Sequence, residues 1–334
     1  MSTTITVIPG DGIGPDIIDA TIKILDKAGC DLNYEFADAG LVALDKHGEL
    51  LPDTTLNAIE RNKVTLKGPL TTPVGGGFTS INVTLRKQFN LYANLRPVVS
   101  FKGTQARYDN IDIITIRENT EGMYSGLGQT TSADGSEAEA MSKVTRAGCE
   151  RIVRFAYEVA RREGRKKVTA VHKANILKST SGLFLSVARE VAKDYPDIQS
   201  EEMIVDATCM KLVMTPENFD VIVTTNLFGD IISDLCAGLV GGLGMAPGAN
   251  IGQDCAIFEA VHGSAPDIAG QNLANPSSVI LAAVQMLEHL GQQDNAKRIL
   301  NALRETIESG DRTTRDLGGE HGTDEFTQAI LERL

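Results

Sequence analysis

Apolar residues recur along the chain with two alternating periods, and this pattern predicts an α/β fold with a largely parallel sheet. Short runs rich in β-branched residues predict strands at 4–8, 33–37, 64–67, 111–116, 168–171 and 221–224. Apolar residues at helical spacing predict helices at 14–28, 143–163, 182–193, 231–240, 277–290 and 295–308. Such alternation is typical of crossover units, in which parallel strands are joined by helices.

Two stretches interrupt the alternation of strands and helices. Residues 123–140 are polar, and they predict either a disordered loop or an arm that leaves the body to meet a partner. Residues 240–251 are rich in glycine and predict a crossover or a hinge. Since no Pro/Ser-rich linker divides the chain into two halves, we expect one domain to be inserted within another.

The first glycine cluster, I-P-G-D-G-I-G-P-D at residues 8–16, lies between a predicted strand and a predicted helix, as a dinucleotide fingerprint does. Gly10, Gly12 and Gly14 give G-x-G-x-G, however, and Pro15 takes the place where the fingerprint needs a small residue. The cluster therefore predicts a tight turn rather than a Rossmann phosphate site.

The charge of the chain restricts its partners. Its 334 residues carry a formal net charge of −12, from 32 basic and 44 acidic side chains. Nucleic-acid binding requires clustered cations, so nucleic acid is not expected as a partner. A small anionic substrate is compatible, because a basic pocket can lie inside an acidic protein.

The cysteines and the apolar runs bear on the compartment. The five cysteines are scattered and form no C-x-x-C pair, as expected of reduced thiols in the cytoplasm. No apolar run reaches the ~18 residues that span a bilayer, and the first predicted strand begins too early for a targeting peptide. We therefore expect a cytoplasmic protein without a membrane partner.

Three arginines stand near predicted strand and loop ends: Arg86, Arg96 and Arg117. Guanidinium groups pair with carboxylates in a bidentate manner, so the three could bind a substrate with several carboxylates. Their spacing alone is also compatible with unrelated surface positions. Ser80 and Asn82, at the start of a helix that contains Arg86, could add hydrogen bonds to a ligand or simply cap the helix.

Two aspartates lie four residues apart in N-L-F-G-D-I-I-S-D. On a helix Asp230 and Asp234 face the same way, and a cation between them would relieve their repulsion. Carboxylates together with substrate oxygens and water suit Mg²⁺ or Mn²⁺. Asp206, which is expected to close a strand in I-V-D-A-T, is a third candidate ligand. The alternative is that all three are ordinary surface acids.

Two further side chains are candidates for proton transfer. Lys173 follows a predicted strand in V-H-K-A-N-I-L-K, and an amine in a desolvated cationic cleft can act as an acid or a base. Tyr124 is a phenol seven residues after Arg117. Either residue could instead be an ordinary exposed side chain. Residues 259–276 are predicted to form a loop, in which Asp267 could bind a ribose diol or cap a turn.

Together these segments resemble the β-decarboxylating dehydrogenases, the family of isocitrate, isopropylmalate and homoisocitrate dehydrogenases. The resemblance runs from I-P-G-D-G-I-G-P to R-T-T-R-D-L-G-G, and its longest motif is N-L-F-G-D-I-I-S-D-L-C-A-G-L-V-G-G-L-G-M-A-P-G-A-N-I. It implies a fold of two α/β domains, distinct from the Rossmann fold. Residues 1–98 and 246–334 would form the large cofactor-binding domain, and residues 99–245 the small domain, with a clasp arm at about 123–145.

The resemblance also implies the chemistry, which is oxidation of a 2-hydroxy acid by a nicotinamide cofactor and then loss of its β-carboxylate. Five side chains would bind the substrate: Ser80, Asn82, Arg86, Arg96 and Arg117. Asp230 and Asp234, with Asp206 of a second copy, would hold Mg²⁺ or Mn²⁺. Tyr124 would protonate the product carbon, and Lys173 of the second copy would help to remove the hydroxyl proton. Such a shared site makes a homodimer the smallest active unit.

The resemblance implies further where the cofactor binds. The adenosine end would rest on the loop 262–270, and the loop 71–77 would lie towards the nicotinamide. The implied contacts are Ile13, Thr72, His262, Gly263, Ala265, Pro266, Asp267, Ile268 and Asn275. NADP-dependent relatives carry lysine and tyrosine where this chain has Asp267 and Ile268. Although Arg315 lies near a second phosphate-contact position, Asp267 would repel the 2′-phosphate, and we expect NAD.

Within the family, the stretch S-I-N-V-T-L-R around Ser80 indicates the substrate. It resembles the isocitrate enzymes, in which serine and asparagine face the γ-carboxylate, whereas isopropylmalate enzymes carry leucines there. The resemblance therefore implies conversion of isocitrate to 2-oxoglutarate and CO₂ in the tricarboxylic acid cycle. Homoisocitrate and isopropylmalate are the alternative substrates. A regulatory subunit of a hetero-oligomeric isocitrate dehydrogenase is an alternative of another class, although every matched position keeps its chemistry.

Overall fold

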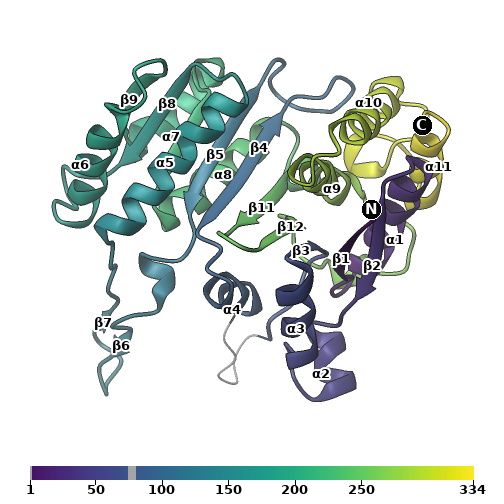
Figure 1. Ribbon diagram of the computed structural model, residues 1–334, viewed down its shortest axis with the longest axis horizontal. Helices are drawn as coiled ribbons and strands as arrows, with labels where there is room; N and C mark the ends of the chain where they lie inside the picture. The colour runs from purple at the N-terminus through teal and green to yellow at the C-terminus, as the bar shows by residue number, and fades with distance from the viewer. Residues whose placement is uncertain (1, 74–79) are drawn as a thin grey trace.

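The computed structural model describes residues 2–73 and 80–334, and within them a ten-stranded sheet crosses the molecule (Figure 1). The order of its strands is β2-β1-β3-β12-β11-β4-β5-β10-β8-β9. Their bounds are β1 Thr3–Ile8, β2 Leu32–Phe36, β3 Val64–Lys67, β4 Ala93–Val99, β5 Asp112–Glu118, β8 Lys167–His172, β9 Gln199–Ile204, β10 Val221–Thr224, β11 Pro247–Ile251 and β12 Ala256–Ala260. The predicted α/β class is confirmed.

The sheet is parallel towards both ends and antiparallel in the middle. β4 pairs antiparallel with β5 and β11, and β11 pairs antiparallel with β12. The sequence pattern did not predict β4 and β11. β4 contains Pro97 and β11 begins P-G, and such residues usually exclude a strand. The expectation of a crossover at 240–251 was therefore wrong for its second half, which is β11.

Helices cover both faces of the sheet. One face carries α1 Gly14–Lys27, α5 Arg146–Arg162, α6 Thr180–Ala192 and α9 Ser277–His289, with α10 Gln293–Ser309 and α11 Thr323–Leu331 packed outside. The other carries α3 Asp53–Asn62, α4 Ile81–Gln88, α7 Val205–Met214 and α8 Asn226–Leu239. Successive side chains of β5 point to opposite faces of the sheet. Ile114 and Ile116 pack in the cluster under α5, whereas Ile113 packs with Ile232 of α8.

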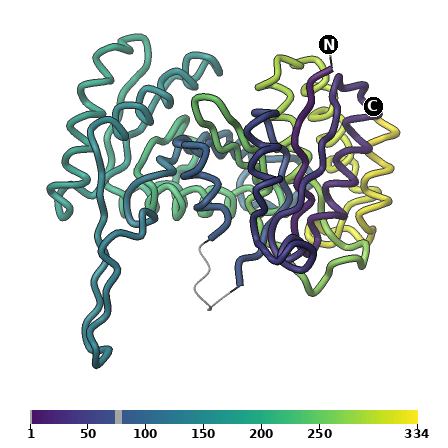
Figure 2. Tube along the Cα trace, turned by 60° about the horizontal axis from the view of Figure 1, so that its bottom comes forward, coloured from purple at the N-terminus to yellow at the C-terminus, as the bar shows by residue number. Residues whose placement is uncertain are grey.

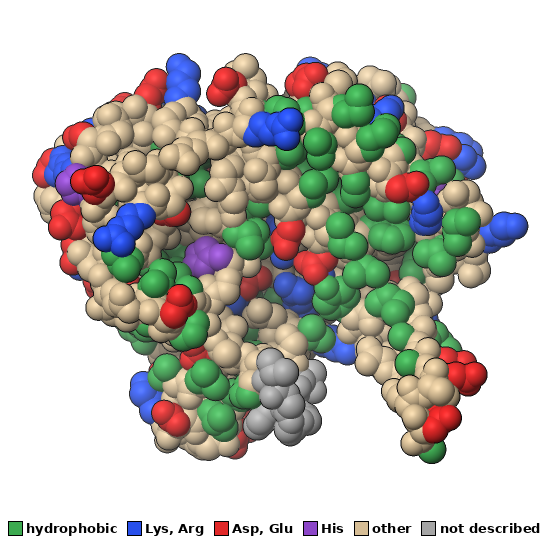
Figure 3. Space-filling view, turned by 180° about the vertical axis from the view of Figure 1, so that it is seen from behind, with side chains coloured by type: hydrophobic (Ala, Val, Ile, Leu, Met, Phe, Trp, Pro, Cys, Tyr) green, Lys and Arg blue, Asp and Glu red, His purple; other side chains and the backbone are tan. Residues whose placement is uncertain are grey.

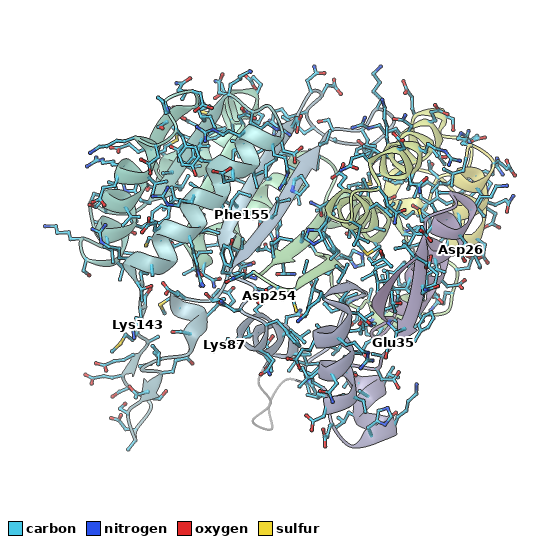
Figure 4. The ribbon with its side chains drawn as sticks, viewed as in Figure 1. Asp26, Glu35, Lys87, Lys143, Phe155 and Asp254 are labelled. Atoms are coloured by element: carbon cyan, nitrogen blue, oxygen red, sulfur yellow. The ribbon has the colours of Figure 1, made fainter. Side chains whose placement is uncertain are left out.

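Between α5 and α9 the sheet is not covered by a helix (Figure 1). A cavity of about 580 Å³ lies there, lined among others by Leu95, Ile114, Phe155 and Phe258. Phe155 of α5 lies at its edge (Figure 4). This cavity is on the α5 side of the sheet, and the polar residues described below are on the α8 side.

Residues 123–140 contribute most of an arm, not a disordered loop. The short strands β6 Thr130–Thr131 and β7 Ala138–Glu139 pair antiparallel, and the resulting hairpin projects far from the body (Figure 2). A bridge between Gly122 and Lys143 closes its base. An isolated pair of two-residue strands has little stability of its own, so a partner surface for the arm remains the expectation.

Several boundaries differ from those expected. The helix predicted at 231–240 begins five residues earlier, at Asn226, and the loop predicted at 259–276 gives its first two residues to β12. The short helix α2 Leu41–His47 was not predicted. Within the described residues no helix is long and apolar enough to cross a membrane. The domain boundaries stay a prediction.

The hydrophobic cluster under α5 can be tested by truncation. We expect Phe184→Ala in α6 to lower the free energy of unfolding by about 3–5 kcal/mol, because the side chain is fully buried. The matched change Phe36→Ala removes the same atoms from edge strand β2, where the side chain is 61% exposed, and should cost under about 1 kcal/mol. Denaturant unfolding of both variants measures the difference, and equal losses would contradict this core.

Candidate active site

The candidate site lies where β5 and β10 end. These strands are parallel neighbours, with Thr224 of β10 opposite Arg117 of β5. Their carboxyl ends therefore meet at one edge of the sheet, which is where open α/β sheets bind ligands. β5 leads into the short 3₁₀ helix η1 Met123–Ser125, and β10 leads directly into α8. The topology thus brings Arg117, Tyr124 and the aspartates of α8 together.

One face of α8 supplies most of the hydrogen-bonding groups. Asn226, Asp230, Ser233 and Asp234 follow one another at helical spacing, so their side chains lie on the same side of the helix. Gly229 lets this face approach β5 closely, because a Cβ there would lie 2.5 Å from Cγ of Arg117. The sequence motif N-L-F-G-D-I-I-S-D is therefore a packing surface as well as a candidate metal site.

Arg117 is buried at the centre of the cluster, with 1% of its side chain exposed. Its Nε and Nη2 donate to Oδ1 of Asn226 at 3.1 and 2.8 Å, and its Nη1 pairs with Asp230. Burial, followed by the charge of Arg86, lowers its pKa to about 10. The guanidinium group is thus held in one orientation and remains charged at neutral pH.

Arg96 approaches the same helix from β4. Its Nη1 donates to Oγ of Ser233 at 2.6 Å and to Oδ1 of Asp234 at 3.0 Å. Its Nη2 lies 3.8 Å from Oδ1 of Asp230. Asp230 is therefore shared between two arginines. Burial raises the pKa of Asp230, but the charges of the three arginines and the hydrogen bond from Tyr124 together outweigh burial, and the pKa lies below its usual value.

Arg86 of α4 is the third arginine, and it faces a buried ion pair. Lys67 of β3 and Glu259 of β12 lie 2.6 Å apart and are almost completely buried, and Nη2 of Arg86 is 3.9 Å from the same carboxylate. Burial opposes the charge of Glu259, but the charges of Lys67 and Arg86 keep its pKa well below its usual value. Asn250 also donates to Glu259, at 2.6 Å.

Tyr124 completes the cluster from η1. Its hydroxyl donates to Oδ2 of Asp230 at 2.5 Å, and its ring lies 4.9 Å from the guanidinium carbon of Arg117. Burial and then the hydrogen bond to Asp230 raise the pKa of the phenol. Lys87 of α4 donates to the carbonyl of Ser125 at 3.1 Å, which ties η1 to the helix that carries Arg86 (Figure 4).

The cluster is built to receive an anion. Arg86, Arg96 and Arg117 converge with Asp230 and Asp234, and Lys67 with Glu259 adds no net charge, so cations exceed carboxylates by one. Within this cluster and at the start of α4, four buried atoms have no hydrogen-bond partner among the described residues: Nε of Arg86, Nε of Arg96, Oδ1 of Asn82 and Nδ2 of Asn226. Figure 3 shows acidic and basic side chains gathered in a hollow of this face. This geometry favours the expectation that the three arginines bind one anion together over the alternative that they are unrelated surface residues.

Ser80 and Asn82 lie at the start of α4. Ser80 is exposed and caps the helix, since its Oγ accepts the N–H of Val83 at 3.5 Å. Asn82 and Arg86 are one helical turn apart and lie on the same side. Oγ1 of Thr72 accepts the N–H of Ile81 at 3.3 Å, so the predicted cofactor residue Thr72 contacts the helix of the predicted substrate residues.

Asp206 does not close a strand, as had been expected. β9 ends at Ile204, and Asp206 lies in the first turn of α7. It pairs with Lys173 at 2.6 Å, and this hydrogen bond lowers its pKa. Among the described residues no third histidine, cysteine, aspartate or glutamate joins Asp230 and Asp234 in a metal-binding group. One copy of the chain thus separates Lys173 and Asp206 from the arginine cluster.

Two of the predicted cofactor segments pack against each other. The N–H of Ile13 donates to the carbonyl of Ser264 at 2.8 Å, so the first glycine turn packs on the loop 262–270. His262 has a buried Nε2 with no partner among the described residues, and burial lowers its pKa. Asp267 and Gly263 are exposed at the surface. The remaining predicted contacts of this loop are Ala265, Pro266 and Ile268, of which Pro266–Ile268 form the 3₁₀ helix η4.

Asn275 is buried beyond this loop, at the start of α9. It donates to Oδ2 of Asp316 at 2.8 Å, and it accepts the N–H of Ser277. The loop 71–77 is described only as far as Pro73, and its predicted position near the nicotinamide lies outside the described residues from Val74 onward.

Several residues of the site were not predicted from the sequence, among them both members of the Lys67–Glu259 ion pair. Asn226, Gly229 and Ser233 stand inside the quoted motif, and their helical spacing relative to Asp230 would have placed them on its face. Glu259 gives no such signal, because its burial beside Lys67 depends on the pairing of β3 with β12.

Comparison with known proteins bears on this geometry. A sequence model described as isocitrate/isopropylmalate dehydrogenase matches residues 4–330. The chain belongs to this family. It is 50% identical over 332 residues to the mitochondrial "Isocitrate dehydrogenase [NAD] catalytic subunit 5" of Arabidopsis thaliana. The match covers 99% of this chain and 88% of that relative. It is 49% identical over 330 residues to the 3-isopropylmalate dehydrogenase of Archaeoglobus fulgidus, which covers 99% of both.

A solved structure agrees with the same family. The crystal structure of isocitrate dehydrogenase from Methylococcus capsulatus matches with a TM-score of 0.96 at 55% identity over 99% of both chains. The predicted family and fold class are confirmed, and the protein is an enzyme of this dehydrogenase family. Because an isocitrate and an isopropylmalate dehydrogenase stand at nearly equal identity, overall similarity does not choose the substrate.

The protonation state of Tyr124 can be measured. We expect its phenol to ionise at a pH above the usual value of about 10, because burial and Asp230 both disfavour the phenolate. The difference in phenolate absorbance between the wild type and Tyr124→Phe during an alkaline titration isolates this group. In Asp230→Asn the ionisation should move to lower pH. An unshifted titration in both proteins would contradict the contact.

Proposed function

We propose that this family member catalyses NAD-dependent oxidative decarboxylation of isocitrate to 2-oxoglutarate and CO₂, assisted by Mg²⁺ or Mn²⁺. The observation that carries the proposal is the convergence of Arg86, Arg96 and Arg117 beside Asp230. Three guanidinium groups in a partly buried site suit a substrate with three carboxylates, since an uncompensated buried charge is costly. Isocitrate has three carboxylates, and isopropylmalate has two.

The start of α4 supports the same choice. Ser80 and Asn82 are polar, and Oδ1 of Asn82 is buried without a partner among the described residues. An isopropyl group placed here would leave these groups without hydrogen bonds, and sites built for polar substrate groups reject apolar analogues strongly. Homoisocitrate is the second candidate substrate, because one added methylene changes binding by only about 1–3 kcal/mol.

The chain's own residues would position the substrate and move its protons. The arginines hold the carboxylates, and the buried bonds of Arg117 to Asn226 fix one of them in orientation. When bound, NAD supplies the hydride acceptor and the divalent ion supplies a Lewis acid beside the 2-oxygen. As the carbonyl forms, the hydroxyl proton leaves to a base. The bond to the β-carboxylate then breaks, CO₂ departs, and the electron pair stays on the substrate carbon. Tyr124 donates a proton to that carbon, because its raised pKa keeps the phenol protonated.

We infer that the base comes from a second copy. Lys173 and Asp206 are paired with each other in this chain. Exposed apolar side chains lie on the helices next to them, namely Met210, Val213 and Met214 of α7, Leu227 and Ile231 of α8, and Ile176 and Leu177 after β8. An apolar patch of this kind on helices around a site is typical of a subunit interface. A homodimer formed through it would carry Lys173 and Asp206 to the partner's arginine cluster.

The same dimer would complete a metal site. Asp230 and Asp234 present two carboxylates one helical turn apart, 34% and 54% exposed, and hard divalent ions prefer such oxygen ligands. Two carboxylates are few for Mg²⁺ or Mn²⁺, so Asp206 of the second copy, substrate oxygens and water would supply the rest. Both aspartates are paired with arginines in this structure, and a divalent ion and an anionic substrate would have to exchange those partners together.

NAD fits the second group of segments. The unpartnered Nε2 of His262 is a hydrogen-bonding group in need of a ligand, and Asp267 lies exposed on the same loop. A carboxylate can accept hydrogen bonds from both ribose hydroxyls of NAD, and it repels the 2′-phosphate of NADP. At ~4 Å and an effective dielectric of ~20, each pair of unit charges costs about 4 kcal/mol before screening.

The substrate proposal can be tested on the purified single chain. With NAD and Mn²⁺ we expect kcat/KM for isocitrate to exceed that for isopropylmalate and homoisocitrate. Ser80→Glu should lower kcat/KM for isocitrate by about 100-fold or more, because a second carboxylate would face the γ-carboxylate. Gln88→Glu, which adds the same charge at an exposed position at the end of α4, is the matched control.

Three outcomes would count against the substrate proposal. Equal losses in Ser80→Glu and Gln88→Glu would place Ser80 away from the substrate. A higher kcat/KM for homoisocitrate or isopropylmalate would replace isocitrate. An inactive single chain that regains activity with a homologous partner would instead indicate a regulatory subunit.

The cofactor proposal makes a separate prediction. The wild type should prefer NAD over NADP by more than tenfold in kcat/KM, which corresponds to about half of the unscreened repulsion. Asp267→Lys combined with Ile268→Tyr should reverse the preference. Asp267→Asn, which removes the charge at nearly constant size, should narrow the preference without reversing it. Comparable kcat/KM values for the two cofactors in the wild type would refute the role of Asp267.

A further inference from the structure

The first glycine turn interlocks with two other loops. The N–H of Asp11 donates to the carbonyl of Pro69 at 2.8 Å, and the N–H of Ile13 donates to the carbonyl of Ser264 at 2.8 Å. Gly12 has a positive φ of 57°, and a Cβ there would lie 1.9 Å from the Ser264 carbonyl oxygen. Three segments that are distant in sequence are therefore packed against each other without space between their backbones.

The carboxylate of Asp11 lies inside this junction with 3% of the residue exposed. Its Oδ2 accepts the N–H of Thr71 at 2.7 Å, and its Oδ1 accepts the N–H of Val42, in the first turn of α2, at 3.1 Å. Gly40 makes room for it, because a Cβ on Gly40 would lie 2.1 Å from Oδ2. Both oxygens of one buried carboxylate are thus used to hold two backbone segments.

Thr71 and Thr72 extend this junction in two directions. Oγ of Ser264 and Oγ1 of Thr71 lie 2.6 Å apart, which joins the 68–73 segment to the loop 262–270. Oγ1 of Thr72 accepts the N–H of Ile81 at 3.3 Å, which joins the same segment to α4, the helix that carries Arg86. A movement of Thr71 would therefore change the contacts of this segment with both the loop 262–270 and α4.

We propose that Asp11 is a positioning residue that couples the cofactor loop to the substrate helix. The inference rests on the proposed function, because it takes the loop 262–270 as the NAD site and α4 as part of the isocitrate site. Asp11 itself touches neither ligand. It fixes the Thr71–Thr72 segment, and that segment contacts both sites.

The geometry requires aspartate and excludes its amide. Each carboxylate oxygen of Asp11 faces a backbone N–H, so both oxygens must accept. Asparagine has a single acceptor oxygen, and its NH₂ group would face the other N–H donor. Asp16 of α1 offers a matched contrast, because its Oδ2 accepts the N–H of Gly270 on the same loop at 3.0 Å. Asparagine at position 16 keeps the one acceptor that this contact uses.

The test compares Asp11→Asn with Asp16→Asn, which remove the same charge from the same region. Titration of each protein with NADH, followed by NADH fluorescence, gives the dissociation constant without turnover. We expect Asp11→Asn to weaken NADH binding about ten- to hundred-fold and to raise KM for isocitrate, with a smaller change in kcat. Asp16→Asn should stay within about twofold of the wild type. A purely structural role of Asp11 would lower the melting temperature and the active fraction but leave the NADH dissociation constant of the folded protein unchanged.

An unchanged NADH dissociation constant in folded Asp11→Asn would overturn the inference. Should Asp11→Asn fail to fold, Thr71→Val decides, because it removes only the hydroxyl that contacts Ser264 and keeps the shape. Weaker NADH binding in Thr71→Val supports the coupling, and unchanged binding refutes it. A wild type that neither binds NADH nor oxidises isocitrate would refute the proposed function instead, so the two failures are distinguishable.

Discussion

The carboxylate of Asp230 is shared by two arginines and a tyrosine, and the arrangement of the site depends on this one group. Arg117 is almost completely buried, which a charged side chain tolerates only with a nearby partner of opposite charge. That partner must come from α8, so β5, β10 and α8 have to meet in one register. Gly229 leaves room for the close approach of α8 to Arg117, and Oδ1 of Asn226 accepts hydrogen bonds from Nε and Nη2 of Arg117.

The same sharing leaves the cluster short of negative charge. Two carboxylates face three arginines, and Glu259 is already neutralised by Lys67. The carboxylates of a polyanionic substrate would balance the charge of the arginines. Asp230 and Asp234 would then be free to bind a divalent ion. Substrate and metal binding are therefore expected to assist each other, because each removes the charge imbalance that the other creates. The interlocked loops around Asp11 place the proposed cofactor site against the same helix α4.

How much of this could be predicted from the sequence depended on whether the signal was local. The strands at 64–67 and 221–224 and the helical face of Asp230 and Asp234 were predicted correctly, because their patterns lie within a few residues. β4 and β11 were missed, since their proline and glycine residues are tolerated only through pairing with distant strands. Asp206 was placed on a strand, but the chain turns into α7 one residue earlier. The ion pair of Lys67 with Glu259 could not be predicted, because it depends on strand order. The choice of isocitrate stays a prediction that rests on residues such as Ser80 and Asn82, because overall similarity does not choose the substrate.

A crystal structure of the chain with isocitrate and Mn²⁺ would show whether the arginine cluster and the aspartates of α8 bind substrate and metal together. We predict substrate carboxylates within hydrogen-bond distance of Arg86, Arg96 and Arg117, and Mn²⁺ bound to Asp230 and Asp234 with Asp206 of a second copy. The hydrogen bonds of Arg117 to Asn226 should persist, while the contact between Arg96 and Asp234 opens. Isocitrate bound elsewhere, with the arginines still paired to Asp230 and Asp234, would show that the arginine cluster is not the substrate site.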